Sequence, residues 1–322
     1  MRLLGDIGGT HARFALERPG LGLGDVAHLR TKDHPSLEAA ILAFLAPVLD
    51  ADRPRCAALA VAAPILGDRV ALVNGPWSFS IAELRARFGL DQVAVLNDFE
   101  ALAYSLPGLA AADVVPIGEG RAQPGAPRIV LGPGTGLGLG ILVHTSSGPV
   151  AIATEAGHAS LAAADDAEAE ILAVLRRRFG HASAERALSG AGLVNLRAAV
   201  AEIAGATVEP LTPEEITARA RAGTDPLCAQ ALAAFLGLLG GFAGNAALMT
   251  GARGGVYIAG GIVGQIMAEL MASHFRARFI AKGRYRAYLD AIPTLVIRRP
   301  DPAFLGLSLY LDQHSPISGS AP

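Results

Sequence analysis

The 322-residue sequence predicts an α/β protein made of two similar units, each with a mixed sheet flanked by helices. Three observations support this prediction. Continuous apolar segments of strand length alternate with segments of helical periodicity, which is typical of strands covered by helices on both faces. An apolar strand, a glycine turn and a returning strand occur at residues 3–16 and again at 129–143. A segment rich in Gly, Pro and Ala, residues 107–128, lies between the two halves and predicts a domain boundary.

The first half begins with an expected hairpin, followed by strands and helices in alternation. A helix is expected at 34–49 because Pro and Ser precede apolar residues at helical spacing, and a second at 80–89 because it ends at a glycine. The strands are expected at residues 2–8, 11–18, 25–31, 56–65, 69–74 and 92–98, and a further helix at 99–106.

The second half repeats the strand, glycine turn and strand over residues 128–144. The helix expected at 166–180 has acids at its start and three arginines, 176–178, at its end, which suits the helix dipole and indicates a solvated helix end. Thr212, Pro213 and Glu215 form a capping-box pattern before the next helix. The remaining elements are a strand at 254–262 followed by a helix, and a strand and a helix over 294–311.

One long segment, between Asp225 and Arg253, contains no charged residue and resembles a membrane span in composition. Four glycines lower its helix stability, and no basic cluster flanks it. A fully buried, closely packed helix of a protein outside the membrane is the preferred interpretation.

Charge and cysteine content restrict the classes of partner. The 27 basic and 29 acidic residues give a net charge of −2, so no basic excess points to nucleic acid. Cys56 and Cys228 are too few and too far apart for a disulfide framework or a cysteine-based zinc site. The apolar run at the N-terminus is too short for a signal peptide, and we therefore expect a cytoplasmic protein.

The two glycine turns predict binding of an anion. Successive backbone N–H groups in such a turn form an anion-binding concavity, and Thr10 and Thr135 add a hydroxyl to each. Two turns from two units are suited to holding a polyphosphate across a cleft, and Asp6 beside the first turn suits a Mg²⁺ ion with its waters. The alternative is that the glycines only form tight hairpins, since neither turn fits the Walker or dinucleotide patterns. Arg13, on the returning strand, is open to interpretation as a surface or structural charge.

Asn97 and Asp98 stand where an apolar strand meets a helix. Ligands of open α/β sheets bind beyond the carboxyl ends of the strands, and an aspartate placed there can act as a general base on a hydroxyl. The alternative is a helix N-cap, which both residue types favour.

Polar side chains also follow the second turn. Glu155 and His158 are suited to hydrogen bonding with a polyol, and Gly157 between them indicates a loop rather than a metal-binding helix. Glu185 follows Ser183 near an expected helix start, where compensation of the helix dipole is the simplest interpretation of its charge.

Six motifs in order, "LGDIGGTHAR", "NDFEALA", "GPGTGLG", "EAGH", "SAERALSG" and "GGVYIAGGIV", resemble those of the bacterial glucokinases, a family of the hexokinase–actin superfold. The similarity runs from Leu3 to about Leu311. The chain lacks the cysteine-rich zinc motif of a related kinase class that also contains sugar-responsive repressors.

The resemblance implies two ribonuclease-H-like domains with a cleft between them, residues 1–108 plus 302–322 and residues 109–301. It implies transfer of a phosphoryl group from ATP, with Mg²⁺, to the 6-hydroxyl of glucose, in a homodimer. The implied roles are, for the catalytic base, Asp98; for sugar binding, Asn97, Glu155, His158 and Glu185; for the first phosphate loop, Asp6, Gly8, Gly9 and Thr10; for the second, Gly134, Thr135 and Gly136; and for the adenosine, Gly260 and Gly261.

The sequence departs from the family pattern at three positions. The family usually has Asn at the position of His11, often Ala at that of Pro133 and usually a second glycine at that of Ala156. None of the three replaces a proposed catalytic or sugar-contacting side chain. The alternatives are a kinase for another hexose and a non-catalytic sugar sensor of the same fold.

Overall fold

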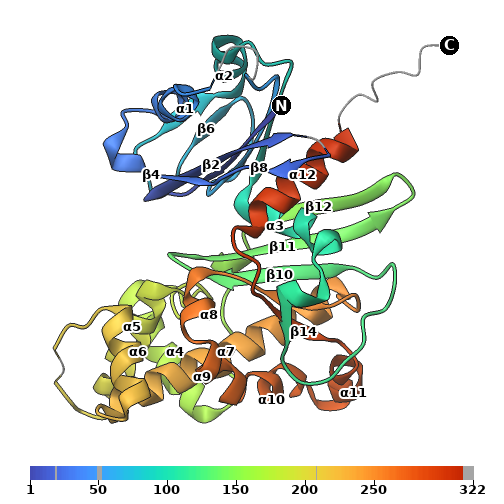
Figure 1. Cartoon of the computed structure of the whole chain (residues 1–322). Coiled ribbons are helices and arrows are strands. Elements are labelled where there is room, and N and C mark those ends of the chain that lie inside the picture. The colour runs from blue at the N-terminus through green and yellow to red at the C-terminus, as the bar shows by residue number, and fades with distance from the viewer. Residues whose placement is uncertain (19, 49–52, 208, 315–322) are drawn as a thin grey trace. The chain divides into compact units, whose positions relative to one another are not determined.

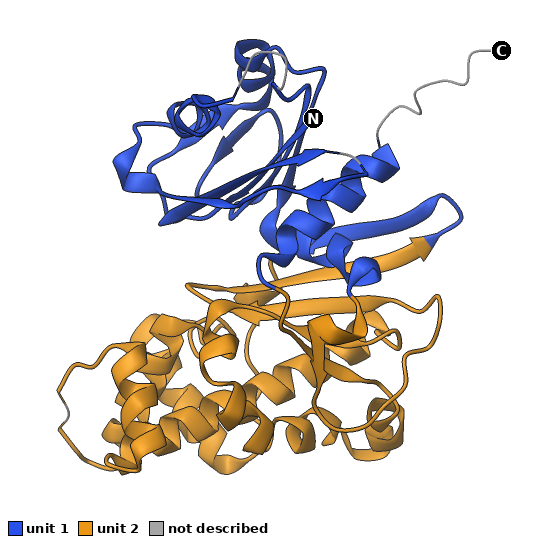
Figure 2. Ribbon diagram, in the orientation of Figure 1, with its two compact units in different colours: residues 1–109, 145–153, 300–322 blue, residues 110–144, 154–299 orange. Residues whose placement is uncertain are grey.

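The structure, a computed structural model, describes residues 1–18, 20–48, 53–207 and 209–314 (Figure 1). The chain divides into two compact units, shown in blue and orange in Figure 2. The first comprises residues 1–109, 145–153 and 300–322, and the second residues 110–144 and 154–299. Both are α/β units with sheets flanked by helices, which confirms the predicted fold class.

The first unit is built on a mixed sheet in which β1, β5 and β8 run parallel and β2 pairs antiparallel to β1. The strand order is β3-β2-β1-β5-β8, with β4 also paired to β2. A separate hairpin joins β6 to β7. The strand bounds are β1 (Arg2–Ile7), β2 (His11–Arg18), β3 (Gly22–Leu23), β4 (Ala27–Arg30), β5 (Cys56–Val61), β6 (Arg69–Ala71), β7 (Ser78–Ser80) and β8 (Gln92–Asn97).

The helices of this unit lie where the sequence predicts them, although the first is shorter than the expected range of 34–49. Ser36 caps the first of them, since its Oγ accepts the Ala39 N–H at 3.2 Å, and the second ends at Gly89 with a left-handed φ of 60°. Phe14, Leu59 and Trp77 belong to the core that these elements enclose. The helix bounds are α1 (Leu37–Leu45), α2 (Ile81–Phe88), α3 (Asp98–Ser105) and, from the end of the chain, α12 (Pro302–His314).

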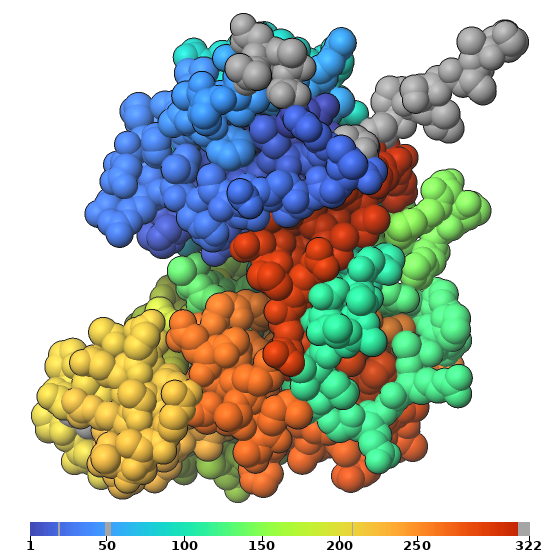
Figure 3. All heavy atoms as spheres, in the orientation of Figure 1, coloured from blue at the N-terminus to red at the C-terminus, as the bar shows by residue number. Residues whose placement is uncertain are grey.

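The helix α12 packs against the N-terminal strands, as the red and blue atoms of Figure 3 show. Arg2 forms ion pairs with Glu17 at 3.2 Å and with Asp312 at 2.6 Å, and the Ser308 hydroxyl donates to Glu17 at 2.5 Å. These bonds attach the end of the chain to its beginning within one unit. Residues 315–322 of the predicted first domain, and Leu49 of its first helix, lie outside the described residues.

The second unit has a mixed sheet in which β10, β13 and β14 run parallel and β11 and β9 pair antiparallel at either side. The predicted strand, glycine turn and strand at 128–144 is the β10–β11 hairpin. The strands of this sheet are β9 (Val114–Pro116), β10 (Arg128–Pro133), β11 (Leu137–Thr145), β13 (Val256–Ile258), β14 (Thr294–Ile297) and, next to β11, β12 (Gly148–Thr154). All of β12 except Thr154 is grouped with the first unit.

The helices of the second unit include the long apolar segment. They are α4 (Asp166–Phe179), α5 (Gly190–Ile203), α6 (Pro213–Ala222), α7 (Pro226–Thr250), α8 (Gly261–Gln265), α9 (Met267–Ala272), α10 (Phe275–Ile280) and α11 (Arg286–Asp290). Among the described residues, α7 alone is long and apolar enough to cross a membrane, and 67% of its most apolar window is buried in the protein. The helix is therefore mostly, rather than fully, buried.

The predicted domain bounds and the compact units differ at residues 145–153. The sequence-based division places this segment in the second domain, whereas the structure groups it with the first unit. The contacts explain the difference, because the Gln313 side chain lies against Gly148 and the Tyr104 hydroxyl lies near the Ala151 backbone.

Candidate active site

Two strands of the first unit end in the predicted carboxylates. β1, β5 and β8 are parallel and in register, with Ile7 opposite Val61 and Val61 opposite Asn97. Asp6, near the end of β1, and Asp98, directly after β8, therefore lie along one edge of the same sheet. This is the edge where α/β proteins bind their ligands.

Asn97 and Asp98 have separate structural roles. Asn97 is the N-cap of α3: its Oδ1 accepts the N–H groups of Phe99 at 2.9 Å and Glu100 at 3.3 Å, and the Glu100 carboxylate accepts the Asn97 N–H at 3.3 Å. Its amide also donates to the Ala63 carbonyl at 3.2 Å. The capping interpretation thus holds for Asn97. Asp98 is the first residue of the helix, half-buried, and its Oδ1 accepts the Phe99 N–H at 3.0 Å.

Asp6 is held by an arginine. Arg13 Nη1 donates to Asp6 Oδ2 at 2.7 Å, and Arg13 Nε lies 3.5 Å from the carboxylate of Asp301. Burial raises the pKa of the Asp6 carboxyl, and the charge of Arg13 opposes this rise. Arg13 is therefore a structural charge that joins two aspartates.

The first glycine turn is closed by a hydrogen bond from the Gly8 N–H to the His11 carbonyl at 2.9 Å. A Cβ atom at Gly9 would lie 2.1 Å from the Asn74 carbonyl oxygen, so only glycine allows this approach. Thr10, at the exposed tip, follows directly. The predicted residues of this turn thus lie between β1 and β2, close in sequence to Asp6.

The second glycine turn, in the other unit, brings together predicted residues from distant motifs. The Gly134 N–H donates to the Gly136 carbonyl at 2.8 Å, with the exposed Thr135 between them. Gly260 has a φ of 102°, and a Cβ atom on it would lie 2.4 Å from the Pro133 carbonyl oxygen. Gly260 and, after it, Gly261 at the start of α8 are therefore beside this turn.

Glu185 is bound to the first residue after the second turn. Its Oε2 accepts the Leu137 N–H at 2.9 Å, and its own N–H donates to the Gly157 carbonyl at 2.9 Å. The residue stands ahead of α5, which is capped by Ser189. Compensation of a helix dipole, the interpretation from the sequence alone, is therefore wrong for Glu185, because its carboxylate contacts a strand instead.

Glu155 precedes a short 3₁₀ turn, Ala156–His158, and His158 is its last residue, so the segment is a loop as Gly157 predicted. A Cβ atom at Gly157 would lie 2.0 Å from the Leu137 carbonyl oxygen, so this loop also depends on a glycine. The two side chains are 61% and 63% exposed, with Glu155 Oε2 3.8 Å from His158 Nε2. Through Leu137, the loop, Glu185 and the second turn form one connected group.

The metal-binding side chains of the structure can be compared with what the predicted Mg²⁺ ion requires. Within the described ranges, no group of three His, Cys, Asp or Glu side chains could hold a metal. Mg²⁺ bound through phosphates and water needs only one or two carboxylates, so this finding is compatible with the ion. Arg13 contacts Asp6 directly, and binding of the ion by Asp6 through a water molecule stays a prediction.

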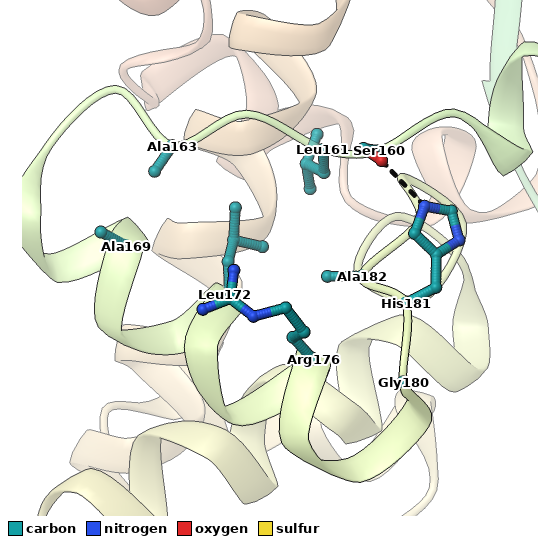
Figure 4. Close-up of a pocket in the computed structure, with 9 residues that line it drawn as sticks. All are labelled: Ser160, Leu161, Ala163, Ala169, Leu172, Arg176, Gly180, His181 and Ala182. Atoms are coloured by element: carbon teal, nitrogen blue, oxygen red, sulfur yellow. Dashed lines mark hydrogen bonds between the residues drawn. The ribbon is translucent and has the colours of Figure 1, made fainter.

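A separate concavity of about 330 Å³ in the second unit includes none of the predicted site residues. Figure 4 shows its lining, with Leu161 and Leu172 near its centre and the His181 ring hydrogen-bonded to the Ser160 hydroxyl at 2.9 Å. This bond links the segment before α4 to the segment after it, which supports a structural role for His181.

Comparisons with known proteins agree over the whole chain. A family model described as Glucokinase matches residues 3–314. Glucokinase of Aromatoleum aromaticum is 48% identical over 312 residues, which cover 97% of this chain and 94% of the relative. The crystal structure of glucokinase from an Antarctic psychrotroph has a TM-score of 0.87 and 35% identity, with coverage of 97% of this chain and 98% of that one.

A more distant structure, a ROK family glucokinase from Streptomyces griseus in complex with glucose and AMPPNP, shares the fold. Its TM-score is 0.63 at 19% identity, with 96% of this chain and 98% of that chain covered. The family model and the 48% identical relative both extend over nearly the full length of the chain. The chain therefore belongs to the glucokinase family.

Proposed function

We propose that this chain transfers the γ-phosphoryl group of ATP to the 6-hydroxyl of D-glucose, forming glucose 6-phosphate, with Asp98 as the general base. Membership of the family makes the chain a kinase that phosphorylates glucose. The observation that carries the finer proposal is the position of Asp98, a half-buried carboxylate at the carboxyl end of a parallel strand. Asn97, buried and the N-cap of α3, fixes the backbone beside it.

Phosphoryl transfer requires positioning and charge neutralisation more than covalent catalysis. The Phe99 N–H fixes the orientation of the Asp98 carboxylate through Oδ1. From there the carboxylate orients the sugar 6-hydroxyl and accepts its proton as the bond to phosphorus forms. A general base of this kind contributes about 10²–10⁴-fold to the rate.

We assign the other sugar hydroxyls to Asn97, Glu155, His158 and Glu185. Carboxylates accept hydrogen bonds from hydroxyls, and an imidazole can donate or accept. The exposure of Glu155 and His158, and the fixed position of Glu185 on Leu137, support this assignment.

The two glycine turns are proposed to bind the phosphates of ATP, with Gly260 and Gly261 near the adenosine. The glycines support this proposal, because the backbone at Gly9 and Gly260 lies too close to neighbouring carbonyl groups for any side chain to fit. A phosphate at either turn would therefore meet backbone amides. The Streptomyces griseus relative binds glucose and AMPPNP. Asp6 would hold Mg²⁺ through water, and the ion, when bound, supplies neutralisation of phosphate charge.

The decisive experiment measures glucose-dependent ADP release with Mg-ATP, beside the variant Asp98→Asn. We expect the variant to lose about 10²–10⁴-fold in kcat, because an amide cannot accept the proton, and to retain glucose binding. Asp25→Asn, an exposed aspartate of the same unit, is the matched control and keeps its activity. Near-wild-type turnover of Asp98→Asn would remove this residue from the mechanism.

A panel of sugars in the same assay distinguishes glucose from another hexose, and turnover of any of them contradicts a non-catalytic sensor.

We also propose that the protein is a homodimer and that it is cytoplasmic. Cys56 and Cys228, both free thiols, are compatible with a reducing compartment. Size-exclusion chromatography with light scattering measures the oligomeric state directly.

A further inference from the structure

Thr31 is a buried residue that is hydrogen-bonded to the first glycine turn. It follows β4 directly and is only 2% exposed. Its hydroxyl donates to the Gly9 carbonyl at 2.7 Å, and its backbone N–H donates to the Thr10 carbonyl at 3.0 Å. A single buried residue thus binds two consecutive carbonyl groups of the turn.

The planar trans peptide turns these contacts into an orientation of the amides. In each peptide unit the C=O and N–H groups point in opposite directions. Since the carbonyls of Gly9 and Thr10 face Thr31, the N–H groups of Thr10 and His11 face away from it. The Asn74 backbone also lies close to Gly9, since a Cβ atom there would be 2.1 Å from the Asn74 carbonyl oxygen.

The second glycine turn has a comparable support. The Gly134 carbonyl accepts the N–H of Gly190, the first residue of α5, at 2.9 Å. In both units a carbonyl of the turn is therefore bound by a donor from outside the hairpin. In the second turn this donor is a backbone group, whereas in the first a side-chain hydroxyl takes part, so only the first can be tested by substitution.

We propose that Thr31 is a positioning residue for the nucleotide: it holds the carbonyls of Gly9 and Thr10 back, so that the amides of Thr10 and His11 face the phosphates of ATP. This inference rests on the proposed function of the turn. A carbonyl oxygen directed at a triphosphate repels it, whereas convergent N–H groups attract it. The Thr31 hydroxyl acts on the turn without contacting the substrate.

The substitution Thr31→Val removes the hydroxyl and retains the shape of the side chain. Because the site is buried, water does not replace the lost donor, and the Gly9 carbonyl is left unsatisfied unless its peptide rotates. Rotation would turn the Thr10 amide away from the phosphate. We expect Thr31→Val to raise the dissociation constant of Mg-ATP roughly tenfold.

The test uses the full chain and three variants. Thr31→Ser restores the hydroxyl and is expected to regain most of the affinity for Mg-ATP. Thr294→Val is the matched control: Thr294 is 1% exposed, and its hydroxyl donates to the Ile117 carbonyl at 2.5 Å, in the other unit. Isothermal titration calorimetry gives the dissociation constant of Mg-ATP, steady-state assays give both KM values and kcat, and thermal unfolding gives Tm.

We expect Thr31→Val to raise the KM for ATP and the dissociation constant of Mg-ATP together, with the KM for glucose unchanged. Thr294→Val lowers Tm by a similar amount without changing nucleotide affinity. If Thr31→Val binds Mg-ATP as wild type does, or if it loses no more affinity than Thr294→Val, the positioning role is wrong.

A further variant distinguishes this failure from failure of the proposed function. Gly8→Ala alters the turn directly, because its Cβ atom would lie 3.3 Å from the His11 carbonyl oxygen. Weaker Mg-ATP binding in Gly8→Ala with normal binding in Thr31→Val rejects the inference and retains the turn as the nucleotide site. Wild-type affinity in both variants rejects the turn itself, and the inference with it.

Discussion

Asn97 and Asp98 show how adjacent residues of similar chemistry divide their tasks. The sequence left two interpretations of the pair, a helix N-cap and a catalytic carboxylate. The structure gives the cap to Asn97, whose side chain accepts two N–H groups of α3 and donates to Ala63. Asp98, one position later, is the first residue of α3, at the sheet edge where the substrate is proposed to bind. The choice depends on which residue begins the helix, and a sequence pattern does not resolve one position.

Glu185 marks the limit of local reasoning at the residue scale. From its neighbours alone, its charge was attributed to a helix dipole, and only the family resemblance assigned it to the sugar. Its carboxylate accepts the N–H of Leu137, 48 residues earlier in the chain. Contacts of this kind depend on tertiary structure. The hydrogen bond from the Thr31 hydroxyl to the Gly9 carbonyl, 22 residues away, is a second example.

Glu155 offers a test of sugar binding. Glu155→Gln replaces a charged acceptor with a neutral one, and loss of a hydrogen bond to a charged group costs about 1.5–3 kcal/mol. We expect the KM for glucose to rise by roughly 10- to 100-fold, with the KM for ATP little changed. Glu170→Gln, an exposed glutamate on α4 of the same unit, is the control. Unchanged KM and kcat in Glu155→Gln would show that this residue does not bind the sugar.

At the scale of elements, the helices with clear caps were predicted most accurately. Thr212 and Glu215 form the expected capping box, and Pro213 begins α6. The expected strands were located correctly, but several are shorter than expected: β5 ends at Val61, β6 at Ala71 and β13 at Ile258. The sequence did not predict the strands β3, β7, β9 and β12. The region after β13 was predicted as one helix and contains four short ones, because turns at residues such as Gly283 interrupt the backbone hydrogen bonds.

The glycines of α7 explain why an apolar helix of 25 residues packs inside the protein. A Cβ atom at Gly240 would lie 2.2 Å from the Phe275 carbonyl oxygen, and one at Gly244 would lie 2.4 Å from the Phe279 carbonyl oxygen. The backbone of α10 therefore packs directly against the backbone of α7 at these two glycines. From the sequence alone these glycines only lower the stability of the helix, because the sequence does not show which element packs against them.

Two substitutions on α7 are expected to change stability in opposite directions. Gly244→Ala forces α10 away and should lower the free energy of unfolding by about 1–3 kcal/mol. Gly241→Ala, with nothing within 4 Å of the added Cβ atom, should raise it by about 0.5–1 kcal/mol through better helix propensity. Urea unfolding of both variants measures the difference. Equal effects at the two positions would contradict the close packing of α7 and α10.

At the scale of the whole molecule, the sequence predicted two α/β units because the strand, glycine turn and strand occurs twice. It did not predict that residues 145–153 join the first unit, because their contacts with Tyr104 and Gln313 link segments that are distant in the chain. The proposed functional residues divide in the same way. The first unit holds the first turn with Asp6, Asn97 and Asp98, and the second unit holds the other turn with Glu155, His158 and Glu185.

Global stability should depend on pH through Asp225, which caps α7. The hydrogen bond from the Cys228 thiol, with those from backbone N–H groups and Arg197, lowers the pKa of Asp225 to about 2, against the opposing effect of burial. A carboxyl whose pKa is lower in the folded state stabilises that state fully above its unfolded pKa, which is about 3.9. This contribution is then lost as the pH falls from about 4 to about 2.

The variant Asp225→Asn isolates this effect, because Asn is an equally good N-cap but carries no charge for Arg197, which is 5% exposed. We expect the variant to unfold at lower urea than wild type at pH 6, since the Arg197 charge is left buried without its partner. As the pH falls from about 4 to about 2, wild type should lose stability faster than the variant, and the difference between them should shrink. Urea unfolding at a series of pH values measures this difference, and a constant difference down to pH 2 would mean that Asp225 does not set the acid stability of the fold.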